Sequence, residues 1–253
     1  MEPPKFFDDM NEDMIKQWHY YFSVLQPQSG DMVLDVGCSL GDADKGLLMA
    51  YPTLRRVVGI DISEKRIQTC LAKWQADGSP TKLEFRLADA QNLPFPDESF
   101  NRVFSVDTLE WLQDPAKALQ EMLRVTRPGG VALVVHSDFD TQVFNAADRQ
   151  LNRKIVHSFS DAGPNGLIGR ELFNLCKAAG FARVRPLVYT LINTVWKPEA
   201  YACRTARMMR DWLVEKAAVP EKEIECWLAD LAAQGAAGKF FYTINRNICF
   251  CEK

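Results

Sequence analysis

Histidine is scarce in this chain, and its cysteines show no metal-binding or disulfide pattern. The 253 residues include 3 histidines and 7 cysteines, and no two cysteines form a CxxC pair or join a histidine cluster. An odd number of scattered cysteines is typical neither of a disulfide framework nor of a structural zinc site. We therefore expect reduced cysteines, no metal centre and a cytoplasmic location.

Long apolar runs and basic tracts are also absent. No stretch approaches the roughly 18 uncharged apolar residues that a membrane-spanning helix needs, and residues 1–14 are acidic rather than signal-like. The chain carries 30 basic and 33 acidic residues, for a net charge of -3. This balance argues against nucleic acid as the main partner. A hydrophobic content of 47% instead indicates a globular protein with a sizeable core.

The first half of the chain alternates between strand and helix patterns. Residues 10–25 place apolar side chains at three- and four-residue steps, which predicts an amphipathic helix. Strands are predicted at residues 30–37, 55–63, 82–88, 100–106 and 131–137, with helix patterns beginning near residues 42, 63 and 115. Such alternation is typical of a parallel sheet with helices on both faces.

After residue 137 the alternation is less regular. A polar stretch at 138–165 precedes a predicted helix at 167–179, a strand at 181–192, helices at 199–217 and 221–234, and a last strand at 239–253. We expect an α/β fold with a doubly wound, mostly parallel seven-stranded sheet, helices on both faces and a helical cap formed by the C-terminal insertions. The expected organisation is a single domain over residues 1–253, with an N-terminal helix (1–30), a ligand-binding core (31–137), and the remaining strands with the cap (138–253).

Glycines and acidic residues follow the strands at one edge of the predicted sheet. Gly37 and Gly41 come after the first strand in "VLDVGCSLGD", Asp61 ends the second strand and Asp89 ends the third. Glycine lets the backbone approach a ligand closely, and a carboxylate can accept hydrogen bonds from both hydroxyls of a ribose. A second acid can accept from an exocyclic adenine amine. Because open parallel sheets bind ligands at this edge, the sequence predicts an adenosine site there.

Four segments in this part of the chain carry a family resemblance. "VLDVGCSLGD", "VVGIDIS", "ADAQNLPFPDESFNRVFSVDTLEWL" and "LRVTRPGG" follow one another within residues 31–137. In this order and spacing they resemble the Rossmann-like (class I) S-adenosylmethionine-dependent methyltransferases, in the small-molecule branch that includes the ubiquinone and menaquinone biosynthesis methyltransferases. The resemblance implies S-adenosylmethionine as cofactor, S-adenosylhomocysteine as product, and a small-molecule acceptor methylated on oxygen, nitrogen or carbon.

The resemblance also implies roles for individual residues. The matching positions are Asp35, Gly37, Cys38, Ser39, Gly41, Asp61, Ile62, Asp89, Ala90 and Val106. Asp35 and the loop after it would hold the methionine end, Asp61 the ribose hydroxyls, and Asp89 the adenine edge. The Val106 backbone would lie beside the sulfonium. Tyr21, on the N-terminal helix, either covers the methionine carboxylate or belongs to the core.

The sequence departs from the family pattern at two positions. Ser39 stands where the middle glycine of the family's loop is usual, and Trp111 stands where a histidine often follows an acid. Serine is small enough to allow close backbone approach, so the first departure affects fine geometry and not cofactor binding. The second removes a residue that could have served as a base.

Residues for the acceptor are less visible. His136, at the end of the fifth strand, is the first candidate for a general base, and Asp138 could position a hydroxyl or amine. The alternative for His136 is a structural hydrogen bond to a backbone carbonyl. Arg204, Arg207 and Arg210 recur on one side of a predicted cap helix, where they either bind an acidic substrate or form a solvated face.

The cap itself has a predicted role. Its helices at 199–217 and 221–234 carry methionine and aromatic side chains suited to enclosing an acceptor and excluding water. We therefore expect the cap to contact the acceptor, and cofactor affinity to depend little on it.

Three other functions compete with this interpretation. A nicotinamide-dependent oxidoreductase is disfavoured because the loop contains only Gly37 and Gly41, and Asp42 would repel a diphosphate. A macromolecular methyltransferase is disfavoured because the fourth strand ends in "SVDT" and not in [DN]PP[YF]. A non-catalytic S-adenosylmethionine-binding protein stays open.

Overall fold

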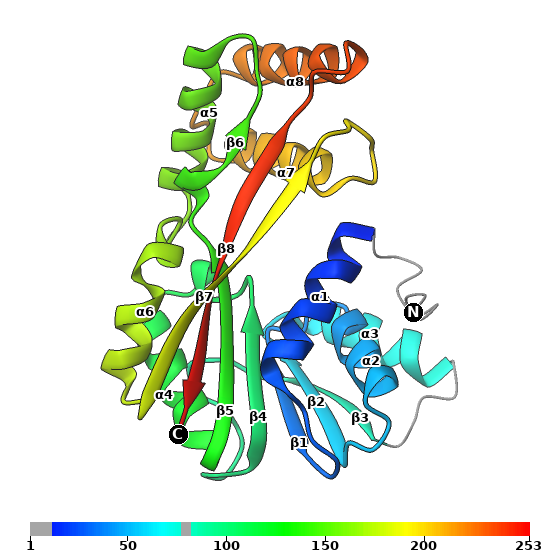
Figure 1. Ribbon diagram of the computed structural model, residues 1–253, viewed down its shortest axis with the longest axis vertical. Coiled ribbons are helices and arrows are strands. Elements are labelled where there is room, and N and C mark those ends of the chain that lie inside the picture. Colours follow the sequence, from blue (N-terminus) through cyan, green and yellow to red (C-terminus); the bar gives the residue numbers. More distant parts are fainter. Residues whose placement is uncertain (1–11, 77–81) are drawn as a thin grey trace.

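A single mixed sheet runs through the protein. The computed structural model describes residues 12–76 and 82–253. Its strands are β1 (Met32–Val36), β2 (Arg56–Asp61), β3 (Leu83–Leu87), β4 (Phe100–Val106), β5 (Thr126–Ser137), β6 (Val143–Phe144), β7 (Arg183–Asn193) and β8 (Tyr242–Glu252). The first five are parallel in the order β3-β2-β1-β4-β5 (Figure 1). β8 runs antiparallel to β5, and both β6 and β7 pair antiparallel with β8.

Helices cover both faces of this sheet. They are α1 (Glu12–Leu25), α2 (Asp42–Ala50), α3 (Glu64–Ala76), α4 (Pro115–Val125), α5 (Arg149–Ala162), α6 (Ile168–Ala179), α7 (Tyr201–Glu215) and α8 (Glu221–Ala236). Successive strand residues point to opposite faces. On β1, Val33 packs in the cluster that contains α1 and α2, whereas Leu34 packs in the cluster that contains α4 and α6. The doubly wound α/β fold expected from the sequence is confirmed.

Local signals in the sequence set several helix ends. Asp114 precedes α4 and its carboxylate accepts the N–H of Lys117 at 2.9 Å, with Pro115 in the first helical position. This is the arrangement that proline and an N-cap acid favour. At the other end of a helix, Gly180 terminates α6 in a left-handed conformation, with φ of 105°.

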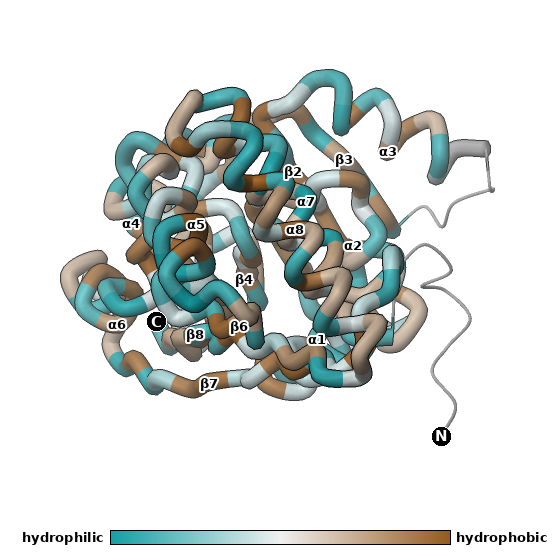
Figure 2. Tube along the Cα trace, turned by 90° about the horizontal axis from the view of Figure 1, so that it is seen from above, coloured by the Kyte–Doolittle hydropathy of each residue, from teal (hydrophilic) through white to brown (hydrophobic). Residues whose placement is uncertain are grey.

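The helical cap is confirmed as well. We call α5, α7, α8 and β6 the cap. Together with the first part of β8 they enclose their own apolar cluster, which includes Phe159, Met209, Trp227 and Tyr242. The cap occupies the top of the molecule in Figure 1 and lies above the sheet in the view from above in Figure 2.

Three expectations need correction. The polar stretch 138–165 contains helix α5, which Asp148 begins by accepting the N–H of Leu151 at 2.9 Å, and which buries Ile155 and Phe159. Within the described residues the sheet contains eight strands where seven were expected, because β6 adds two residues that pair with β8. The fifth strand begins at Thr126 and not at Val131, since Thr126 already pairs with Phe100 of β4. The part of the predicted N-terminal helix before residue 12 lies outside the described residues.

Over residues 12–76 and 82–253, no helix is both long enough and apolar enough to cross a bilayer.

Candidate functional site

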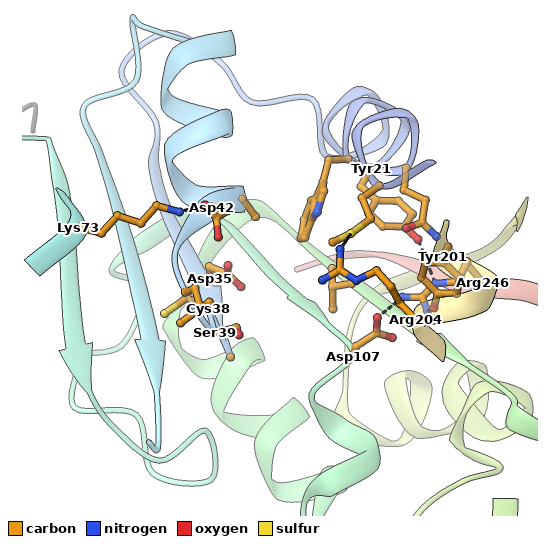
Figure 3. A pocket seen from close by; sticks show the side chains of 17 residues that line it. Tyr21, Asp35, Cys38, Ser39, Asp42, Lys73, Asp107, Tyr201, Arg204 and Arg246 are labelled. Atoms are coloured by element: carbon orange, nitrogen blue, oxygen red, sulfur yellow. Dashed lines mark hydrogen bonds and ion pairs between the residues drawn. The ribbon is translucent and has the colours of Figure 1, made fainter. Parts of the chain in front are cut away.

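A pocket of about 430 Å³ lies at the carboxyl ends of β1 and β4. The loop after β1 forms one wall, and side chains of α1, α7 and β8 form the wall opposite (Figure 3). The lining residues are Met14, Gln17, Trp18, Tyr21, Asp35, Gly37, Cys38, Ser39, Leu40, Asp42, Ala43, Lys73, Val106, Asp107, Tyr201, Arg204 and Arg246. The pocket lies where the strand order reverses between β1 and β4, which is the usual ligand position in open α/β sheets.

Two glycines are required by the shape of the loop after β1. Gly37 has φ of 92°, and a Cβ there would lie 2.0 Å from the Thr108 hydroxyl oxygen. Gly41 has φ of 74°, and a Cβ there would lie 2.4 Å from the Phe85 ring. Positive φ is accessible to glycine without steric cost, so both positions restrict the residue type. The loop therefore packs closely against β3 and the residues after β4.

Ser39 occupies the same loop in a left-handed conformation, with φ of 51°. A residue with a side chain costs about 1–2 kcal/mol in this conformation, and glycine removes that cost. Glycine also makes the unfolded chain more flexible, which offsets part of the gain in stability. We expect Ser39→Gly to raise the free energy of unfolding by about 0.5–1 kcal/mol, measured by urea denaturation. Ser63→Gly is the control, because Ser63 has no positive φ and its replacement should not stabilise. A less stable Ser39→Gly protein would contradict the prediction.

Asp61 links the end of β2 to this loop. Its carboxylate is 5% exposed and accepts the backbone N–H of Ser39 at 3.1 Å and of Ser63 at 2.9 Å. Arg66 contributes a more distant contact, with Nη1 at 3.4 Å. Next to Asp61, the apolar side chain of Ile62 is 67% exposed. A fixed carboxylate beside an exposed apolar surface suits a sugar with an attached flat ring.

The acid predicted at the third strand lies in a turn after β3. The carboxylate of Asp89 accepts the backbone N–H of Gln91 at 2.8 Å, and Asp89 also forms an isolated bridge with Asn92. Ala90 is buried beside it. Asp61, Ile62, Asp89 and Ala90 do not line the pocket, and instead lie beyond it at the ends of β2 and β3.

Two carboxyl groups are buried next to each other beneath the loop. Asp35 on β1 lines the pocket and is 3% exposed, and Asp44 on α2 is fully buried. Desolvation by burial, followed by the neighbouring Asp44, raises the pKa of Asp35 well above its ordinary value. Desolvation also raises the pKa of Asp44 to about 8. Since two adjacent buried carboxylates repel each other, the raised pKa values favour a proton on the pair.

A buried arginine that the sequence analysis did not identify connects the elements of the opposite wall. The guanidinium of Arg246 donates to the Tyr21 hydroxyl at 3.2 Å, the Ser137 hydroxyl at 2.9 Å and the Tyr201 hydroxyl at 3.0 Å, and it pairs with Asp107. These partners belong to α1, β5, α7 and the segment after β4. One side chain of β8 therefore holds the cap helix α7 against the sheet.

Asp107 faces the pocket directly after β4. Its backbone is left-handed, with φ of 53°, and its side chain is 42% exposed. Left-handed non-glycine residues are uncommon, and they persist where surrounding contacts hold them. Here the backbone N–H donates to the Val135 carbonyl at 3.1 Å, and Arg246 holds the carboxylate. The position adjoins Val106, the residue expected beside the sulfonium.

The two predicted acceptor residues are buried and do not line the pocket. His136 is fully buried, with Nδ1 2.6 Å from a carboxylate oxygen of Glu110, and its Nε2 has no hydrogen-bond partner among the described residues. Asp138 is 2% exposed and pairs with Arg170, whose Nη2 lies 2.8 Å from Oδ1. Possible ligand atoms of Asp107, Glu110 and His136 lie within 4.8 Å of one another, which no other such trio in the described chain achieves.

The structure brings six of the predicted cofactor residues into one pocket: Tyr21, Asp35, Gly37, Cys38, Ser39 and Val106. Gly41 is the N-cap of α2 and does not line the pocket. Gln17 and Arg246 line the pocket but lie outside the four motifs, and Asp107 lies within the quoted "SVDT" without an expected role. Of the three cap arginines, Arg204 lines the pocket, and Arg210 pairs with Asp211 at 2.7 Å.

Known proteins resemble this chain in sequence and in structure. Residues 34–134 match the methyltransferase domain family. An uncharacterised 37.1 kDa protein of a Streptomyces fradiae transposon is 31% identical over 87% of this chain and 62% of its own length. The 27-O-demethylrifamycin SV methyltransferase of Amycolatopsis mediterranei is 34% identical over 42% of this chain and 39% of its own length. The chain thus spans less than two thirds of these relatives.

A solved structure shows the same fold. The phospholethanolamine N-methyltransferase 2 of Haemonchus contortus, in complex with phosphomonomethylethanolamine and S-adenosylhomocysteine, superposes with a TM-score of 0.60. It is 16% identical to this chain, and the match covers 94% of this chain and 52% of that one. Residues 34–134 therefore match a methyltransferase domain, and the chain shares the doubly wound fold of a solved methyltransferase structure.

Proposed function

We propose that this protein transfers the methyl group of S-adenosylmethionine to a small-molecule acceptor. The observation that carries the proposal is the convergence of Asp35, the Gly37–Ser39 loop and Val106 on one pocket at the reversal point of the sheet. The S-adenosylhomocysteine in the Haemonchus contortus structure supports the same cofactor here. When bound, the cofactor supplies an electrophilic methyl group on a sulfonium.

The residues present fit such a cofactor in two parts. The pocket would take the methionine end, with Asp35, Gly37, Cys38 and Ser39 on one side and Tyr21 on the other. The ends of β2 and β3 would take the adenosine end. There Asp61 offers acceptors to the ribose hydroxyls, and Ile62 offers an exposed apolar surface to the adenine. Asp89 and Ala90 would border the adenine edge.

We assign removal of a proton from the acceptor to Asp107, Glu110 and His136 together and not to His136 alone. His136 is fully buried, does not line the pocket and contacts the carboxylate of Glu110. Asp107, in contrast, lines the pocket. Asp107 would therefore meet the acceptor, with Glu110 and His136 positioned behind it. Asp138, paired with Arg170, would hold the segment after β5 in place. Tyr201 of α7 would help exclude water from the reacting atoms.

Calorimetry tests this function directly. We expect S-adenosylmethionine and S-adenosylhomocysteine to bind with dissociation constants on the order of micromolar, about -8 kcal/mol, and NADH not to bind. A screen of phenols, alcohols and amines for S-adenosylhomocysteine release then identifies the acceptor. Absence of binding by the folded protein would overturn the proposal, and binding without turnover across the screen would favour a non-catalytic binding protein.

A further inference from the structure

The pocket wall opposite the glycine loop presents a buried hydrogen-bond donor for which the described residues provide no acceptor. Gln17, on α1, is 5% exposed and lines the pocket, and its side-chain Nε2 has no hydrogen-bond partner among the described residues. A buried amide nitrogen without a partner is uncommon in folded proteins and indicates that something else supplies the acceptor. The amide therefore marks a place where a ligand oxygen would be satisfied.

Arg204, on α7, lines the same pocket and contacts α1 at Met14, one helical turn before Gln17. Its guanidinium extends from α7 into the pocket, and its Nη1 contacts the Met14 sulfur, on α1, at 3.6 Å (Figure 3). Met14 and Gln17 are three residues apart on α1 and so share a face. Among the residues that the structure describes, Arg204 forms no ion pair with a carboxylate. A guanidinium fork beside an unsatisfied amide is matched in geometry and charge by a carboxylate.

The neighbouring arginine does not compete for this role. Four N–H groups of Arg246 are already donated to Tyr21, Ser137, Tyr201 and Asp107, so its charge is largely neutralised within the protein. On the opposite side of the pocket, Asp42 similarly neutralises Lys73, with a nitrogen–oxygen distance of 2.7 Å. Arg204 is therefore the pocket-lining cation for which the described residues provide no anion.

We propose that Gln17 and Arg204 form a carboxylate-binding subsite within the pocket. The inference rests on the proposed function and deepens it, because two molecules of that reaction can bring a carboxylate: the methionine part of the cofactor, or an acidic acceptor. In both cases the cap helix α7 takes part in binding through Arg204. If the cofactor is the source, cofactor affinity depends on the cap more than the sequence predicts, because Tyr201 and Arg204 share one pocket with the glycine loop.

The first arm of the test asks whether the cofactor supplies the carboxylate. Calorimetry compares S-adenosylhomocysteine with its decarboxylated analogue, which keeps the ammonium and the adenosine. If the cofactor is the source, Arg204→Gln and Gln17→Leu weaken S-adenosylhomocysteine binding about tenfold each and leave the analogue unaffected, as loss of a charge-assisted hydrogen bond implies. Arg204→Lys should recover part of the loss. Arg207→Gln is the matched control, because Arg207 lies on the same helix, exposed and outside the pocket.

The second arm asks whether the acceptor supplies it. Benzoate and benzyl alcohol are titrated into protein saturated with S-adenosylhomocysteine. If the acceptor is the source, benzoate binds to the wild-type complex and to Arg207→Gln, does not bind to Arg204→Gln, and benzyl alcohol binds to none of them.

The proposal is overturned if neither arm responds to Arg204 and Gln17. That outcome means equal affinities for S-adenosylhomocysteine and its decarboxylated analogue, together with no benzoate binding that depends on Arg204. Failure of the proposed function looks different, because folded wild-type protein would then bind neither S-adenosylmethionine nor S-adenosylhomocysteine.

Discussion

Asp61→Ala is expected to weaken S-adenosylhomocysteine binding by about 2–4 kcal/mol, roughly 30- to 1000-fold, because the variant loses charge-assisted hydrogen bonds to two ribose hydroxyls. The carboxylate is suited to this role by its surroundings. It is 5% exposed, and the backbone N–H groups of Ser39 and Ser63 fix its orientation before any ligand binds. Such preorganisation lowers the entropic cost of binding.

Calorimetry on matched variants separates this role from a general loss of structure. Glu64→Ala removes an acid three residues further on, in the first turn of α3, and should leave the affinity unchanged. Asp61→Asn keeps an acceptor for one backbone N–H but loses the charge, so it should fall between wild type and Asp61→Ala. Thermal unfolding of each variant checks that the fold is retained. Unchanged affinity in Asp61→Ala would mean that the ribose is held by other residues.

The second large effect concerns stability and its dependence on pH. Asp44 is fully buried, neither of its carboxylate oxygens has a hydrogen-bond partner in the described chain, and burial raises its pKa to about 8. We expect Asp44→Asn to raise the free energy of unfolding by about 2–4 kcal/mol at pH 8, because asparagine reproduces the neutral shape of the protonated acid without a charge to bury. Urea denaturation across a pH series measures this difference.

The direction of the pH dependence follows from the raised pKa. Burial raises the pKa of Asp44 to about 8 in the folded protein, against an ordinary value of 3.8. Between these values the folded state keeps a proton that the unfolded state has lost, so wild-type stability falls as the pH rises through this window. The advantage of Asp44→Asn should therefore be small near pH 4 and grow toward pH 8.

A neighbouring acid provides the comparison for this experiment. Asp42 lies two residues earlier on α2 and pairs with Lys73, so Asp42→Asn removes a favourable interaction and should not stabilise the protein. An advantage of Asp44→Asn that stays constant from pH 4 to pH 8 would contradict the raised pKa of Asp44. A loss of stability at pH 8 would contradict it as well.

The pocket wall formed by the loop after β1 was predictable because it is specified by short local sequence patterns. Gly37 and Asp61 each follow a short apolar strand, and the parallel arrangement then places both at one edge of the sheet. The same holds for the start of α4, where the N-cap residue Asp114 and the following Pro115 set the first turn of the helix. Such features depend on a few neighbouring residues, so they can be predicted without knowing the tertiary structure.

The opposite wall was not predictable for a physical reason. Arg246 lies in a strand whose alternation shows which residues share a face, but nothing in that pattern shows what the face contacts. Its partners are Tyr21, Asp107, Ser137 and Tyr201, which only the packing of α1, α7 and the sheet brings together. The burial of His136 likewise depends on neighbours from other elements.

Helix α5 was not predicted, although the sequence contains a helix N-cap and apolar residues at helical spacing. Asp148 accepts the N–H groups of Gln150 and Leu151 as an N-cap, and Ile155 and Phe159 recur at helical spacing. The charged residues before them, Arg149, Arg153 and Lys154, gave the segment a polar average. Periodicity was the informative quantity here, and average polarity obscured it.

The position of β8 has a consequence for how the chain folds during synthesis. This strand follows all the other described helices and strands in the sequence, yet it supplies residues to three apolar clusters: Tyr242 and Ile244 to the cap, Ile248 and Phe250 to the α1 and α2 side, and Cys249 and Cys251 to the α4 and α6 side. None of these interiors can be completed before β8 leaves the ribosome. Until then the edge of β5 stays unpaired, and the nascent chain must carry three unfinished cores that a chaperone or an aggregation partner can reach.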